Sequence, residues 1–172
     1  CNHRCRYCAY LDANMQLGKD MCVKDSIPRD KMLELCKDIA QMGVKAVTFS
    51  GGGEPFMYPH LIEGASILAA GGVSIASLTN GGRLAGEAAE FMAHNALWIR
   101  VSMDGWDDES YVHYRGVSLG EYTRIMNNIE NFIKLGGTCT LGVSYIVDAN
   151  NCSHIPQVLH RYKDIGVRSV KV

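Results

Sequence analysis

The chain has 172 residues, of which 47% are hydrophobic and 20% are charged. This length and composition predict one domain over residues 1–172. With 17 basic and 18 acidic residues the formal net charge is −1, so no overall positive charge favours nucleic acid or an anionic membrane. No apolar stretch reaches the ~18 to 20 residues of a membrane span. The seven cysteines are not spaced as a disulfide framework, and a cytoplasmic protein is predicted.

Helices and strands are predicted to alternate from residue 26 onward. Ser26 and Pro28 are typical of a helix start, and Gly43 is typical of its end. Ser118 and Glu121 form a capping-box pattern before a later helix. Long loops are predicted over 9–25 and 105–117. The predicted strands are 44–49, 73–78, 97–103, 138–147 and 167–172, and the later helices are 59–70, 84–94, 118–133 and 153–165.

This alternation predicts an α/β fold with a parallel sheet, because strands joined through helices form right-handed crossovers. Periodicity alone fits a partial barrel and a doubly wound open sheet equally well. In both architectures, ligands bind at the carboxyl ends of the strands.

Three cysteines open the chain in the string CNHRCRYC, at Cys1, Cys5 and Cys8. Thiolates are the ligands that iron–sulfur clusters require, and a short irregular loop lets three of them converge on one cluster. Three ligands for four irons would leave one iron open for a reaction. A structural zinc site is the alternative, although such sites usually have four protein ligands, and the chain has no second CxxC or HxxxH pair.

Further motifs follow the predicted strands. Residues 50–55 read SGGGEP, residues 79–81 read TNG, and residues 102–105 read SMDG. Glycines let the backbone approach a small ligand closely, and polar residues at strand ends can contact it. The sequence therefore predicts a site at one edge of the sheet.

The combination of CxxxCxxC, GGEP and polar strand ends, in this order, resembles the radical S-adenosylmethionine (SAM) superfamily over essentially the whole chain. The resemblance implies a partial (β/α)6 TIM-like barrel, whose first strand would precede Cys1 in a longer protein. It also implies that Cys1, Cys5 and Cys8 hold a 4Fe-4S cluster. Cluster and SAM would then yield a 5′-deoxyadenosyl radical that takes a hydrogen atom from the substrate.

The same resemblance implies which residues contact SAM. Gly52, Gly53 and Glu54 would seat its methionyl part, and Tyr7 would lie near its adenine. Polar contacts to SAM or substrate would come from Asn80, Ser102 and Asp104. Apart from the resemblance, Arg115 in the predicted loop 105–117 is a further candidate, because a guanidinium can pair bidentately with the SAM carboxylate or an acidic substrate. The alternatives are an ordinary tight turn for the glycines, turn capping for the strand-end residues and a solvated surface position for Arg115.

The substrate is predicted only by class. The SxDG element and the following Arg-Gly resemble members with a SPASM or twitch C-terminal extension, which implies a peptide, a protein side chain or a sugar-derived metabolite as substrate. The resemblance also implies an electron donor such as flavodoxin or ferredoxin. The competing hypotheses are a glycyl-radical activating enzyme, a tRNA-modifying enzyme, and a zinc or electron-transfer module without catalysis.

Overall fold

The computed structural model describes residues 1–22 and 24–172. Five strands form one sheet in the order β1-β2-β3-β4-β5, and every pairing is parallel. The strands are β1 (Ala46–Phe49), β2 (Ser74–Thr79), β3 (Ala96–Ser102), β4 (Thr140–Ser144) and β5 (Ser169–Lys171). The helices are α1 (Gln16–Asp20), α2 (Arg29–Gln41), α3 (Leu61–Ala70), α4 (Gly86–Asn95), α5 (Asp108–Arg115), α6 (Glu121–Lys134) and α7 (Ile155–Asp164), with 3-10 turns η1 (Pro55–Met57) and η2 (Cys152–His154).

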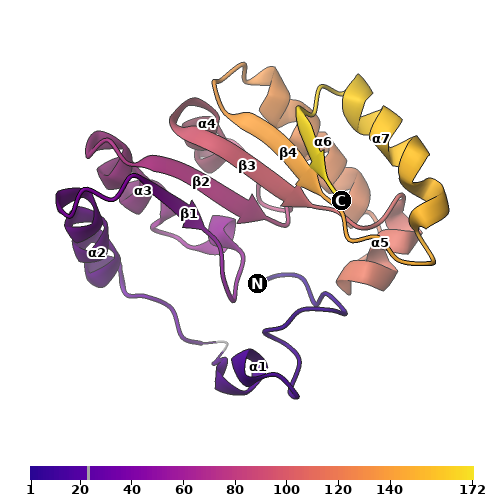
Figure 1. Ribbon diagram of the computed structural model, residues 1–172, viewed down its shortest axis with the longest axis horizontal. Helices are drawn as coiled ribbons and strands as arrows, with labels where there is room; N and C mark the ends of the chain where they lie inside the picture. Colours follow the sequence, from indigo (N-terminus) through magenta and orange to yellow (C-terminus); the bar gives the residue numbers. More distant parts are fainter. Residues whose placement is uncertain (23) are drawn as a thin grey trace.

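The strand order decides between the two predicted architectures. A doubly wound sheet reverses its strand order at a switch point and carries helices on both faces. Here the order follows the sequence without reversal, and α2, α3, α4, α6 and α7 lie along one face of the sheet (Figure 1). The fold is therefore a partial TIM-like barrel, as the resemblance implied.

The hydrophobic core lies between this sheet face and the helices. Strand residues Ile75, Ile99 and Val101 are fully buried, as are Leu68 on α3 and Ile125 on α6. Alternate strand residues point to opposite faces, so the strands contribute every second side chain to this core. The core fixes how the strand ends, which carry the predicted motifs, lie relative to one another.

Three local predictions were wrong. The segment 105–117 is not a long loop, because α5 occupies most of it, and a shorter helix, α1, interrupts 9–25. The capping box also occurs elsewhere: Asp107 and Ser110 cap α5 reciprocally, whereas α6 begins after Gly120, whose φ of 90° is left-handed. The carboxylate of Glu121 instead bonds His3 and Arg124.

Among residues 1–22 and 24–172, none of the helices combines the length and apolar character that crossing a membrane requires.

Replacing Ile125 by alanine tests the position of the core. Because Ile125 is fully buried, Ile125→Ala should lower the free energy of unfolding by about 2–5 kcal/mol. Asn127→Ala, on the exposed side of the same helix, is the matched control and should change it by less than about 0.5 kcal/mol. Urea unfolding measures both, and equal effects would contradict the described packing.

Candidate active site

The cysteine loop is held by the end of α5. The backbone N–H of Arg4 donates to the carbonyl of Arg115 at 2.8 Å, and that of Arg6 donates to the carbonyl of Tyr114 at 3.2 Å. Gly116 ends the helix with a φ of 57°, and a Cβ there would lie 2.6 Å from the Arg4 carbonyl oxygen. A side chain at residue 116 would therefore push the cysteine loop away.

His3 fixes the same loop to α6. Its side chain is almost fully buried, its Nε2 lies 3.1 Å from Glu121 Oε1, and its ring meets Tyr111 edge-on at 5.9 Å between centroids. Burial lowers the pKa of His3, and the hydrogen bond with Glu121 opposes this effect. Sequence reasoning missed this residue, because the spacing of the cysteines gives no signal about the side chains between them.

The glycine turn lies next to the start of the cysteine loop. A Cβ built on Gly53 would be 3.8 Å from the backbone nitrogen of Cys1, and one on Gly52 would meet the side chains of Met21 and Tyr10 at 3.0–3.1 Å. The two segments are about 45 residues apart in sequence, yet they meet because the turn follows β1 at the carboxyl edge of the sheet. The two strongest predicted motifs thus share one site.

Glu54 ties the glycine turn to the end of β2. Its Oε1 accepts hydrogen bonds from Thr79 Oγ1 and the Phe56 backbone N–H, and its Oε2 accepts one from the Asn80 backbone N–H at 2.7 Å. Burial raises the pKa of Glu54, and these hydrogen bonds oppose the rise. Glu54 is 6% exposed, and its carboxylate holds the turn.

Asn80 links the strand end to the cysteine loop. Its Nδ2 donates to Asn2 Oδ1 at 2.7 Å and lies 3.9 Å from Cys1 Sγ, while its Oδ1 accepts from the Gly82 backbone N–H at 2.9 Å. Asn80 therefore caps its own turn and also donates towards the first cysteine. Ser102 lies further along this edge, with its hydroxyl 3.3 Å from that of Ser144.

A buried network joins Tyr7, Asp104, Arg115 and Cys5. One Asp104 oxygen, Oδ2, bonds both the Tyr7 hydroxyl and the Arg115 guanidinium, and the other accepts from the Ile146 backbone N–H at 2.7 Å. Arg115 Nη1 also donates to Cys5 Sγ at 3.2 Å. Arg115 and Asp104 are 6% and 1% exposed. These two groups thus satisfy each other, rather than presenting free charges to a ligand.

The charge of Arg115 is secured by its neighbours. Burial alone would lower the pKa of Arg115, but the acidic groups around it, Tyr111, Asp104 and Cys5 among them, outweigh burial and leave the pKa raised. The guanidinium is therefore a permanent cation beside the second cysteine. The structure places Arg115 between Asp104 and Cys5, and its direct contact with a ligand stays a prediction.

The three thiols do not surround a single metal-ion position: within residues 1–22 and 24–172, no three His, Cys, Asp or Glu side chains are grouped in that way. All three cysteines are free, and Cys1 is exposed. The Asn80 side-chain N–H is directed at Cys1 Sγ, and an Arg115 N–H is directed at Cys5 Sγ. Soft thiolates supported by outer N–H donors are the donor set expected for an iron–sulfur cluster.

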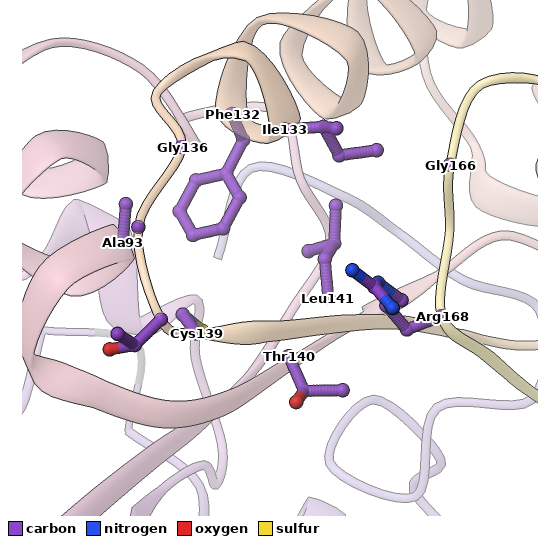
Figure 2. A pocket seen from close by; sticks show the side chains of 11 residues that line it. Ala93, Phe132, Ile133, Gly136, Cys139, Thr140, Leu141, Gly166 and Arg168 are labelled. Carbon is purple, nitrogen blue, oxygen red and sulfur yellow. The ribbon is translucent and has the colours of Figure 1, made fainter.

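A separate cavity of about 420 Å³ lies at the opposite end of the sheet. Figure 2 shows Phe132 and Ile133 of α6, Cys139 and Leu141 near the start of β4, and Arg168 before β5 around it. Burial raises the pKa of the Cys139 thiol to about 11. The amino ends of β4 and β5 border this cavity, so it takes no part in the site formed by the three cysteines.

The fold and the cysteine site define a chain of the Radical SAM superfamily, whose family model matches residues 1–162. The chain belongs to this family. A SAM-dependent nucleotide dehydratase of Lacinutrix mariniflava is 33% identical over 120 residues, which are 65% of this chain and 23% of that protein. A GTP 3′,8-cyclase of Vibrio parahaemolyticus is 28% identical over 95% of this chain and 48% of that protein. The chain thus spans less than half the length of these curated relatives.

Solved structures share the fold. Streptococcus suis SuiB bound to S-adenosylmethionine superimposes with a TM-score of 0.75 at 16% identity, over 99% of this chain and 37% of that chain. Native anSMEcpe with bound AdoMet gives a TM-score of 0.73 at 20% identity, over 99% of this chain and 47% of that chain. At these identities, the likeness establishes the partial barrel itself.

Replacing Glu54 by alanine tests the role of its carboxylate. Glu54→Ala leaves three hydrogen-bond donors without their acceptor, so the free energy of unfolding should fall by about 1–3 kcal/mol. Glu90→Ala, at an exposed position on α4, is the control. Urea unfolding gives the comparison, and an unchanged stability of Glu54→Ala would show that the carboxylate does not hold the turn.

Proposed function

We propose that residues 1–172 are the core domain of a longer radical SAM enzyme, with Cys1, Cys5 and Cys8 as ligands of a 4Fe-4S cluster. When bound, cluster and SAM supply a 5′-deoxyadenosyl radical that takes a hydrogen atom from the substrate. The observation that carries the proposal is the meeting of the cysteine loop and the glycine turn at the carboxyl edge of the sheet. The family match over residues 1–162 supports it.

The glycine turn is the proposed seat of the methionyl part of SAM. Gly53 has no side chain beside Cys1, so its backbone groups are open to a small ligand there, whereas Gly52 packs against Met21 and Tyr10. Glu54 keeps the turn in place through its bonds to β2. Tyr7 is 36% exposed, so its ring can lie against an adenine.

The polar residues at the strand ends then divide into two groups. Asn80 and Ser102 are proposed to contact SAM or the substrate. The Asn80 amide nitrogen lies 3.9 Å from Cys1 Sγ, and the Ser102 hydroxyl lies near the Ser144 hydroxyl at the same edge of the sheet. Asp104 and Arg115 are proposed as positioning residues, because their charges are already paired. Asp104 orients Tyr7, and Arg115 orients Cys5.

The substrate is proposed to be a small molecule or a peptide. The curated relatives are named for nucleotide chemistry, and one solved structure with this fold holds a precursor peptide. One-electron chemistry at this site needs a donor, for which a flavodoxin or ferredoxin is suited. We also propose a cytoplasmic location, because free thiols persist in reducing compartments.

The cluster assignment is tested by replacing one cysteine. Anaerobic reconstitution of the full protein should give about four irons per chain and conversion of SAM to 5′-deoxyadenosine under reducing conditions. Cys5→Ala should lose both. Cys36→Ser is the control, because Cys36 is buried among core residues and its replacement should cost stability while iron is retained. Full iron content in Cys5→Ala would overturn the assignment.

The role of Arg115 is tested through the reduction potential of the reconstituted protein. An N–H donor to a ligand sulfur favours the reduced state, so Arg115→Gln should lower the midpoint potential by about 59 mV, a tenfold change in the equilibrium constant. Arg6→Gln is the control, since Arg6 is a cation of the same loop that bonds His113 and Asp148. The midpoint potential of Arg6→Gln should change less than that of Arg115→Gln.

Arg115→Gln also leaves Asp104 as an unpaired buried charge, which can cost about 3–5 kcal/mol of stability. The double variant Asp104→Asn/Arg115→Gln removes that charge, and its potential should stay below that of Asp104→Asn alone. Equal potentials for these two variants would contradict a donor role for Arg115 towards Cys5.

A further inference from the structure

The sheet has a second face, opposite the helices, which we call the inner face. Ile99 and Val101 of β3 are buried beneath the helices, so alternation places Trp98, Arg100 and Ser102 on the other side. In Figure 1 the helices that flank the sheet lie on its outer side, away from this face. The Arg100 guanidinium lies 5.2 Å from the centre of the Trp98 ring, as expected for neighbours on one face.

Strand register extends the inner face to β4 and β5. Arg100 pairs with Gly142, which pairs with Ser169, and Ser102 pairs with Ser144, which pairs with Lys171. Paired residues of a parallel sheet point to the same side. The inner face therefore carries Trp98, Arg100, Ser102, Ser144, Ser169 and Lys171.

The charged side chains that the strands place on this face are all positive. Arg100 and Lys171 are the charged residues of the five described strands, and none of these strands contains Asp or Glu. On the strand-end loops, Glu54 and Asp104 are buried and already accept hydrogen bonds, and Asp148 is paired with Arg6 and Tyr114. A face with two cations, several hydroxyls and no carboxylate attracts an anion.

Arg100 has an unused donor. Its side chain is half-buried, and its Nε is shielded from solvent without a hydrogen-bond partner in the described part of the chain. A buried donor left unpaired costs free energy. An acceptor brought by a ligand recovers that free energy once the half-buried side chain turns its guanidinium towards the ligand. By register Arg100 lies between Leu78 of β2 and Gly142 of β4. Gly142 has no side chain, and a Cβ built there would lie 2.4 Å from Ser169 Oγ, so the β4 side of Arg100 carries little side-chain bulk.

We propose that the inner face binds an oxyanion of the substrate, a phosphate or a carboxylate, through Arg100 and Lys171. This inference rests on the proposed function, because Ser102 and Ser144 connect the inner face to the edge that carries the cysteines. A guanidinium binds phosphate or carboxylate with two parallel hydrogen bonds, and an ammonium adds a point charge. The anion would hold the substrate on the sheet, with its uncharged part directed to the cysteine edge.

The experiment measures binding rather than turnover. Inorganic triphosphate and citrate are titrated separately into the full, reconstituted protein by calorimetry at about 0.15 M salt, where screening limits weak surface binding. Arg100→Gln should weaken the binding about tenfold, the effect of losing a charge-assisted hydrogen bond. Lys171→Gln, at an exposed position, should weaken it as well. Preference for triphosphate assigns a phosphate, and preference for citrate assigns a carboxylate.

Arg168→Gln is the matched control, because Arg168 is exposed and borders the cavity at the opposite end of the sheet. It removes the same charge and should leave the affinity unchanged. The inference is overturned if the wild-type protein binds neither probe, or if Arg168→Gln weakens binding as much as Arg100→Gln. Iron content and SAM cleavage, measured on the same wild-type sample, report separately whether the proposed function fails.

Discussion

The buried ion pair between Arg115 and Asp104 is the interaction on which the rest of the site depends. A guanidinium in a protein interior is stable only when acceptors surround it. Arg115 finds three: the Asp104 carboxylate, the Met103 carbonyl and Cys5 Sγ. These acceptors belong to the end of β3 and to the cysteine loop, so one side chain of α5 connects the sheet to the first segment of the chain.

The site also depends on the parallel order of the sheet. Every strand ends at the same edge, so the glycine turn after β1, the Asn80 turn after β2 and the Asp104 turn after β3 lie side by side. Each turn approaches the cysteine loop differently: Gly53 lies beside the Cys1 backbone, the Asn80 amide donates to Asn2, and the Asp104 carboxylate bonds Tyr7. The predicted site residues are thereby gathered at one edge of the sheet.

Several features could be predicted from the sequence because their signals are local. Thiolate spacing indicated a cluster loop, and periodic apolar residues with glycine boundaries indicated the alternating α/β order. Other features had no local signal. The polar run at 105–117 reads as a loop, and it forms α5 because Asp107 and Ser110 cap it and because Tyr111 and Tyr114 find buried positions against other segments. His3 is likewise buried through contacts with residues more than a hundred positions away.

By itself, the sequence determined which ligand chemistry is present and which residues follow the strands, since composition and spacing are properties of the chain alone. Periodicity left a barrel-type and a doubly wound sheet open, and the tertiary structure decided between them, because strand order depends on how distant segments pair. It also decided that Arg115 and Asp104 face each other and that Arg100 and Lys171 share a face. Partners of a buried charge are chosen by packing, which no pattern along the chain records.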